Sequence, residues 1–101
     1  MEAKMTVYVI AQLKFTDEDR YRKYQARFFD VFKDSGGRLL AADEKPVVLE
    51  GEWPRDKAVV MSFPDEQQAR AFLESPGYRE ISKDRIAGAD TIALLVHGLA
   101  S

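Results

Sequence analysis

Two segments near opposite ends of the chain alternate as β-strands do, and both carry apolar residues on each face. Residues 5–15 read MTVYVIAQLKF, and residues 90–98 read DTIALLVHG. Because successive side chains of a strand point to opposite faces, Tyr8 and Ile10 lie on the face opposite Val9. The last segment divides its apolar residues between its faces in the same way. Such strands are typical of a sheet that is covered on both sides.

The segment that follows the first of these two strands and ends at the glycine pair 36–37 predicts a helix over residues 17–33. Thr16 or Asp17 can cap its start, and acidic residues follow where the helix dipole favours them. Gly36 or Gly37 supplies the left-handed conformation that ends a helix. Its apolar residues follow the i, i+3, i+7 spacing of one buried stripe, namely Tyr21, Tyr24, Phe28, Val31 and Phe32.

Residues 37–53, GRLLAADEKPVVLEGEW, predict one long strand interrupted near residues 43–46, or two short strands. Pro46 has no backbone N–H to donate, so this part of the chain should lie at a sheet edge or a bulge. The sequence WPRDK is typical of a turn, after which AVVMSF (58–63) pairs back as a hairpin. We expect Gly51 and Trp53 at a bulge or a close subunit contact beside this hairpin.

Two further helical segments complete the order of elements. Asp65 opens one of them, with Gln68 three residues later as in a capping box. Ser75 and Pro76 open the other, which Gly88 ends. The resulting order, β-α-β-β-α-β, predicts an α+β, ferredoxin-like fold. We expect a single domain, residues 1–101, with a four-stranded antiparallel sheet and the helices on one face.

This arrangement leaves one apolar face of the sheet without cover. An apolar patch of that size exceeds the few hundred Å² that monomers commonly expose. A second copy packing sheet to sheet would cover it. We therefore predict a homodimer formed through the sheet face.

Composition excludes several classes of function. The 15 basic and 17 acidic residues are mixed along the chain and give a net charge of −2, so the basic stripe that nucleic acids require is missing. The chain has no cysteine and one histidine, which leaves no thiolate or multi-histidine metal site within a subunit. We predict no cofactor. No apolar run approaches the ~20 residues that span a bilayer. Residues 1–15 lack the features of a signal peptide, which favours a cytoplasmic location.

Four segments together resemble the domain-of-unknown-function 1330 family: GGRLLA, LEGEW, AVVMSFPDEQQARAFLESPGYREI and DTIALLVHG. The resemblance runs from about Val7 to Gly98 and keeps both order and spacing. It implies a dimeric α+β barrel, in which two ferredoxin-like units pair their sheets. Relatives by fold include cofactor-free quinol monooxygenases, haem-degrading enzymes and muconolactone-type isomerases. The family itself brings no established reaction, and fold analogy does not supply one.

Two residues are candidates for proton transfer. His97 is the only side chain whose ordinary pKa lies near neutrality, and it shares a strand face with Thr91, Ala93 and Leu95. The alternative is a partly exposed residue at a strand end. Tyr8 offers a hydroxyl that could orient a ligand or move a proton. In the similar family the last strand often ends in an acidic residue before the glycine, so a carboxylate role there does not transfer to His97.

Four residues are candidates for ligand binding: Arg85, Arg38, Trp53 and Glu50. Arg85 occupies an apolar stripe and needs a partner, because an unpaired buried charge is strongly unfavourable. Glu50 or Asp90 is the expected partner, and a ligand carboxylate is the alternative. Arg38 could reach into the barrel or remain solvated. Trp53 could floor an aromatic pocket or, as we prefer, pack across the dimer interface.

Two hypotheses about function follow. In the first, a homodimeric α+β barrel binds a small aromatic or carboxylate-bearing molecule in a cavity between sheet and helices. It would act as a cofactor-independent oxygenase or isomerase, with His97 or Tyr8 moving protons and Arg85 or Arg38 holding an anion. In the second, the protein is a non-catalytic dimeric module for ligand binding or interaction. Glu50 and Glu52 lie on one face, but two carboxylates alone make a poor metal site.

Overall fold

The secondary structure follows the predicted order. The computed structural model describes residues 5–99, so the outermost residues of the predicted domain, 1–4 and 100–101, lie outside it. Within the described residues there are four strands and three helices. They are β1 (Val7–Phe15), α1 (Glu18–Phe32), β2 (Arg38–Asp43), β3 (Lys57–Phe63), α2 (Glu66–Leu73), α3 (Pro76–Gly88) and β4 (Ala89–His97).

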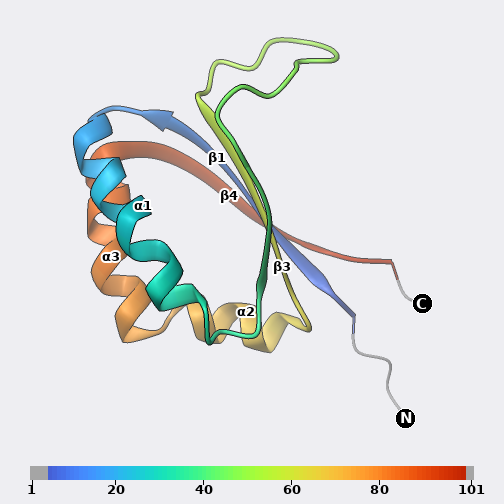
Figure 1. Cartoon of the computed structure of the whole chain (residues 1–101). Helices are drawn as coiled ribbons and strands as arrows, with labels where there is room; N and C mark the ends of the chain where they lie inside the picture. The colour runs from blue at the N-terminus through green and yellow to red at the C-terminus, as the bar shows by residue number, and fades with distance from the viewer. Residues whose placement is uncertain (1–4, 100–101) are drawn as a thin grey trace.

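The strands form one antiparallel sheet in the order β2-β3-β1-β4. All three helices cover the same face of this sheet (Figure 1). The predicted α+β, ferredoxin-like fold is thus confirmed. None of the helices in residues 5–99 is both long and apolar enough to cross a membrane.

Local capping chemistry sets where each helix begins. The side chain of Asp17 accepts from the backbone N–H of Arg20, and the side chain of Asp65 accepts from that of Gln68. Ser75 caps α3 ahead of a proline at its first turn. Past the end of α1, Gly36 takes a φ of +82°, a conformation that other residues adopt reluctantly.

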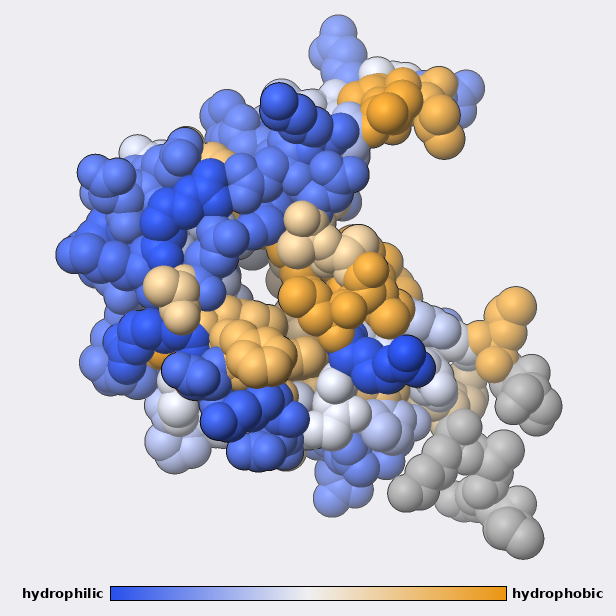
Figure 2. All heavy atoms as spheres, in the orientation of Figure 1, coloured by the Kyte–Doolittle hydropathy of each residue, from blue (hydrophilic) through white to orange (hydrophobic). Residues whose placement is uncertain are grey.

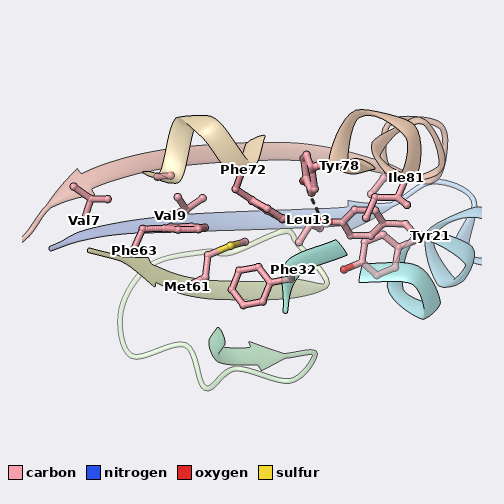
Figure 3. Close-up of a cluster of buried hydrophobic side chains, with 13 residues drawn as sticks. Val7, Val9, Leu13, Tyr21, Phe32, Met61, Phe63, Phe72, Tyr78 and Ile81 are labelled. Atoms are coloured by element: carbon pink, nitrogen blue, oxygen red, sulfur yellow. Dashed lines mark hydrogen bonds between the residues drawn. The ribbon is translucent and has the colours of Figure 1, made fainter. Parts of the chain in front are cut away.

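The core lies between the helices and the inner face of the sheet. Val7, Val9 and Leu13 alternate along β1 toward the helices and are buried there. Aromatic rings from α1, α2 and β3 interleave above them (Figure 3), and the Phe32 and Phe72 rings meet edge to face with centroids 5.3 Å apart. Such aromatic pairs stabilise a core beyond the area that they bury.

The prediction of strand structure in the second half of residues 37–53 is wrong. β2 ends at Asp43, and an irregular loop follows as far as Asp56. The side chain of Asp43 accepts from the backbone N–H of Lys45 at 2.8 Å, which turns the chain away from the sheet. Val47 and Leu49 are then 82% and 94% exposed. Within the described residues, no strand lies beside this segment to pair with its backbone.

The loop between β2 and β3 projects beyond one end of the sheet (Figure 1). A bulge in β2 does occur, but it lies between Leu39 and Ala41 and not at Gly51. Gly51 instead has a φ of +81° within the loop. β2 is an edge strand, but Pro46 lies beyond it in the loop and not at the sheet edge or bulge predicted for it.

The outer face of the sheet, away from the helices, is apolar. Register places Tyr8 opposite Val96, and Ile10 opposite both Leu94 and Val60, all on this face. Leu94 at the centre of β4 is 51% exposed. No helix of residues 5–99 covers this face.

Candidate functional site

A cavity of about 480 Å³ lies between the inner face of the sheet and the helices. Ala11 and Ala93 face each other across β1 and β4, and their short side chains leave room beneath α1 because larger residues there would fill the space. Aromatic side chains of α1 and α3 form the opposite wall, and Phe29 and Leu39 lie at the rim. Figure 2 shows the hollow between helices and sheet, with hydrophobic atoms along its sheet side.

Polar side chains gather at one end of this otherwise apolar cavity. Lys57 of β3 is opposite Leu13 of β1, which is in turn opposite Thr91 of β4. Both polar residues line the cavity, and Arg85 of α3 joins them. The row of three strands therefore places an ammonium group at one side of the cavity and a hydroxyl at the other.

Two buried donors at this end lack a hydrogen-bond partner within the described residues, namely Nε of Arg85 and Oγ1 of Thr91. A buried donor left without a partner costs about 1–3 kcal/mol, and more when the group is charged. Each such group calls for an explanation, and a bound molecule or ion that completes the hydrogen bonding is one.

The expected protein partners of Arg85 lie elsewhere. Glu50 is exposed in the loop between β2 and β3. Asp90 is close to Arg55 instead, with Nη1 and Oδ2 3.9 Å apart. Among residues 5–99, Arg85 has no ion pair with either carboxylate, so the predicted structural pairing is absent.

Lys57 belongs to a chain of charges at the cavity edge. Its Nζ lies 3.6 Å from Oε2 of Glu44 and 4.9 Å from the ring centroid of Tyr21. Arg22 binds both oxygens of Glu44, at 2.6 and 2.8 Å. This double contact lowers the pKa of Glu44 from its ordinary 4.5 to about 2. Burial lowers the pKa of Lys57, and the charge of Glu44 opposes that effect.

Three tyrosines complete the polar part of the wall. The hydroxyl oxygens of Tyr24 and Tyr78 lie 3.1 Å apart and link α1 to α3. Burial raises the pKa of Tyr21 to about 12, with a further contribution from the charge of Glu44. Burial also raises the pKa of Tyr24. The phenols of Tyr21 and Tyr24 therefore remain protonated near neutral pH and act as hydrogen-bonding groups, not as bases.

The two residues predicted to transfer protons do not line the cavity. His97 lies on the inner face opposite Val7, six residues along β4 from Thr91, or about 20 Å at the rise of a strand. There its Nε2 is 2.8 Å from Oε1 of Glu66, and its side chain is 55% exposed. Tyr8 lies on the outer face of the sheet, opposite Val96.

Arg38 and Trp53 also lie away from the cavity. Arg38 is exposed and opposite Ser62, on the outer face. Nε1 of Trp53 donates to Oε1 of Gln12 at 3.1 Å. Because Gln12 shares its strand face with Tyr8, this bond brings the indole to the outer face. Of the six predicted site residues, Arg85 alone lines the cavity.

Sequence reasoning missed Lys57 and Thr91, although their positions carried a signal. Lys57 alternates with Val59, Met61 and Phe63 on the buried face of β3, so a charged residue stands in a core position. Thr91 likewise alternates with Ala93 on the helix-facing side of β4. The informative pattern was a polar residue at a strand position where the alternation predicts an apolar one. Arg85 was found in the same way, as a charged residue within the apolar stripe of a helix.

No group of three or more side chains suited to holding a metal ion occurs within residues 5–99.

The family model of the domain of unknown function DUF1330 matches residues 6–99. The chain belongs to the DUF1330 family. A search of the curated proteins gives no significant match to this DUF1330 protein.

Solved structures share the fold of the DUF1330 protein at low sequence identity. A protein of unknown function from Rhodopseudomonas palustris is 17% identical, with a TM-score of 0.81 over 97% of this chain and 85% of that one. SnoaB, a cofactor-independent oxygenase from Streptomyces nogalater, is 13% identical, with a TM-score of 0.69 over 96% of both chains.

A third structure is a dimeric ferredoxin-like protein of unknown function from Thermobifida fusca. It is 17% identical, with a TM-score of 0.68 over 96% of this chain and 94% of that one. At these identities the three comparisons establish the fold of the DUF1330 protein and leave its ligand to be argued from its own residues.

Proposed function

We propose that this DUF1330 protein is a homodimer that binds a small aromatic carboxylate in the cavity between its sheet and its helices. The observation that carries the proposal is Nε of Arg85, which is buried at the cavity without a hydrogen-bond partner in residues 5–99. A guanidinium recognises a carboxylate through two parallel hydrogen bonds. The hydroxyl of Thr91 supplies another donor at the same end.

The shape and lining of the cavity support the aromatic part. Its volume of about 480 Å³ falls within the range of small-molecule sites. The rings of Tyr21, Tyr24 and Phe28 line it on one side, and alanines form the floor. A flat apolar ring fits between these surfaces, since aromatic groups pack well against one another.

The homodimer is supported by the outer face of the sheet. Ile92, Leu94 and Val96 are large, apolar and at least a third exposed. Trp53 reaches the same face through Gln12. A second copy that covers this face would bury all four side chains. The Thermobifida relative of the same fold is described as dimeric.

The chemistry that follows binding divides into two candidates. Cofactor-independent oxygenation is the first, because SnoaB shares the fold and bears that description. A non-catalytic binding module is the second, and one observation favours it. His97 contacts Glu66, so among the described residues no histidine lines the cavity where an aromatic acid would sit.

A thermal-shift screen of aromatic acids, quinols and lactones tests the binding proposal. We expect benzoate to raise the melting temperature, whereas benzyl alcohol, its uncharged counterpart, does not. Arg85→Met should abolish the shift because it removes the guanidinium. Arg79→Met, on an exposed position of the same helix, should retain it. A benzoate shift that survives Arg85→Met, or no shift with any aromatic carboxylate, contradicts the proposal.

Oxygen consumption then separates the two candidates. If the protein is an oxygenase, an aromatic acid that binds should be consumed together with dissolved oxygen, and Arg85→Met should slow the loss of both. If it is a binding module, ligands bind without any loss of oxygen. An oxygen electrode with the purified full chain measures the difference directly.

A further inference from the structure

Lys57 is a second polar group of the cavity, and it lies across the sheet from Thr91. The two residues are separated by Leu13 of β1, to which both are directly opposite. Two strand spacings put their backbones about 10 Å apart. Both side chains point to the helix side of the sheet and line the same cavity. A bound molecule that lies across the strands would therefore meet a polar group at each end.

The ammonium group of Lys57 has hydrogen-bonding capacity to spare. Its side chain is 5% exposed, and its Nζ is 3.6 Å from Oε2 of Glu44, which is longer than a hydrogen bond. Arg22 already donates hydrogen bonds to both carboxylate oxygens of Glu44, at shorter distances. A lysine carries three donors, and within residues 5–99 none of them has a hydrogen bond of ordinary length. Arg85 of α3 is another charged residue that lines the same cavity.

The two sides of this polar end of the cavity differ in the charge that they accept. Lys57 already faces the negative charge of Glu44, whereas Nε of Arg85 has no hydrogen-bond partner among the described residues. A permanent anion is therefore better placed on the side of Arg85 and Thr91. The Lys57 side suits an oxygen that carries partial charge or becomes charged only when a neighbouring cation stabilises it.

On the basis of the proposed function, we infer that the preferred ligand is a hydroxylated aromatic acid, with its carboxylate on Arg85 and Thr91 and its phenolic oxygen on Lys57. The hydroxyl stands opposite the carboxylate on the ring, because the two anchors lie on opposite sides of Leu13. The ring rests over Leu13, Ala11 and Ala93.

This arrangement favours ionisation of the bound phenol. An ammonium group beside a phenol stabilises the phenolate, because opposite charges attract strongly where little water is present. The O–H bond breaks, the electron pair stays on the oxygen, and the proton leaves to solvent. Lys57 keeps its own proton throughout. The charged and titratable groups around it are Glu44 from the loop after β2, and Arg22 and Tyr21 from α1. Arg85 of α3 lines the same cavity.

Calorimetric titration with three ligands tests the inference on the full chain. We expect 4-hydroxybenzoate to bind about tenfold more tightly than benzoate, the gain expected from one charge-assisted hydrogen bond. 3-Hydroxybenzoate should show a smaller gain, because its hydroxyl points away from Lys57. Lys57→Met should bring the ratio of the two affinities close to one, and the far-UV circular dichroism of the variant shows whether it is folded. Lys83→Met, at an exposed lysine of α3 that pairs with Glu80, should change nothing.

A chromophoric ligand reports the ionisation itself. The phenolate form of 4-hydroxy-3-nitrobenzoate absorbs in the visible, so its pKa can be followed when bound. We expect the wild type to lower that pKa by about one unit, and Lys57→Met not to lower it. If benzoate binds in a manner that depends on Arg85 but the hydroxyl adds nothing, the inference is wrong and the proposed function stands. If no aromatic carboxylate binds, both are wrong.

Discussion

Nε2 of His97 lies 2.8 Å from Oε1 of Glu66, at the end of the sheet remote from Lys57 and Thr91. The contact joins the last residue of β4 to the first turn of α2. It lowers the pKa of Glu66, with the nearby Arg70 adding to the effect. An exposed pair of this kind contributes little to stability.

The position of His97 leads to the first prediction. His97→Ala should change the affinity for benzoate by less than about twofold, because the ring does not contact the cavity and a surface substitution seldom acts at a distance. Arg85→Met should abolish binding in the same titration. If His97→Ala weakens binding as strongly as Arg85→Met does, His97 takes part in the site after all.

The dimer is tested at the centre of the outer face. Leu94→Glu should give a monomer, because a carboxylate at this position would be buried without a partner in the sheet-to-sheet contact. Ile86→Glu is the matched control: Ile86 is 66% exposed on α3, on the helical side. Light scattering at micromolar concentration gives the mass. A mass near the monomer value of 11.5 kDa for the unsubstituted chain would contradict the dimer.

Gly88 is where α3 approaches the start of α1. Its carbonyl oxygen accepts from the backbone N–H groups of Thr16 and Asp17, at 2.9 and 3.1 Å. A Cβ at this position would overlap the backbone nitrogen of Tyr21 and lie 2.8 Å from the carbonyl oxygen of Asp17. Backbone atoms cannot move aside as a flexible side chain can.

Gly88→Ala should therefore lower the free energy of unfolding by about 3 kcal/mol, at the upper end of the usual range for overpacking. Gly77→Ala is the control, because its new methyl group would meet the side chain of Val31 at 3.3 Å. Its effect should stay within about 1 kcal/mol. Urea titration of both variants measures the difference, and equal effects would show that the close approach does not limit the fold.

The elements of the fold were predictable because their signals are local. Asp17, Asp65 and Ser75 mark helix starts within a few residues of sequence, and alternation identifies β1, β3 and β4. The segment around Val47 failed for a nonlocal reason. Its side chains suit a strand, but the chain turns away from the sheet after Asp43, so within residues 5–99 no strand lies beside this segment to share backbone hydrogen bonds with it.

The candidate site was predictable only in part. Arg85 stood out because a charged residue interrupted an apolar stripe, and the same reasoning applied to β3 would have found Lys57. His97 was chosen for its ordinary pKa, a property of one side chain that does not depend on where the strand ends. Whether a side chain lies at a cavity depends on the register of its strand and on the path of the helices. Neither can be deduced from the identity of one residue.

The ion pair of Arg22 and Glu44 gives stability a predictable dependence on pH. Glu44 has a pKa of about 2 in the folded chain and an ordinary value of 4.5. Since the folded value is the lower one, the pair stabilises the fold fully above about pH 5. That contribution is lost as pH falls from 4.5 toward 2, because the unfolded chain takes up the proton first. The carboxylate is 37% exposed, so solvent screening reduces the contribution to about 1 kcal/mol.

Glu44→Gln should therefore lower the free energy of unfolding by about 1 kcal/mol at pH 7 and by much less at pH 2.5. Glu52→Gln, at another exposed carboxylate of the same loop, controls for the removal of one negative charge. Urea titrations at several pH values between 2.5 and 7 give the comparison. If the difference between Glu44→Gln and the wild type stays constant across that range, Glu44 acts through packing or hydrogen-bond geometry, and its charge does not control acid stability.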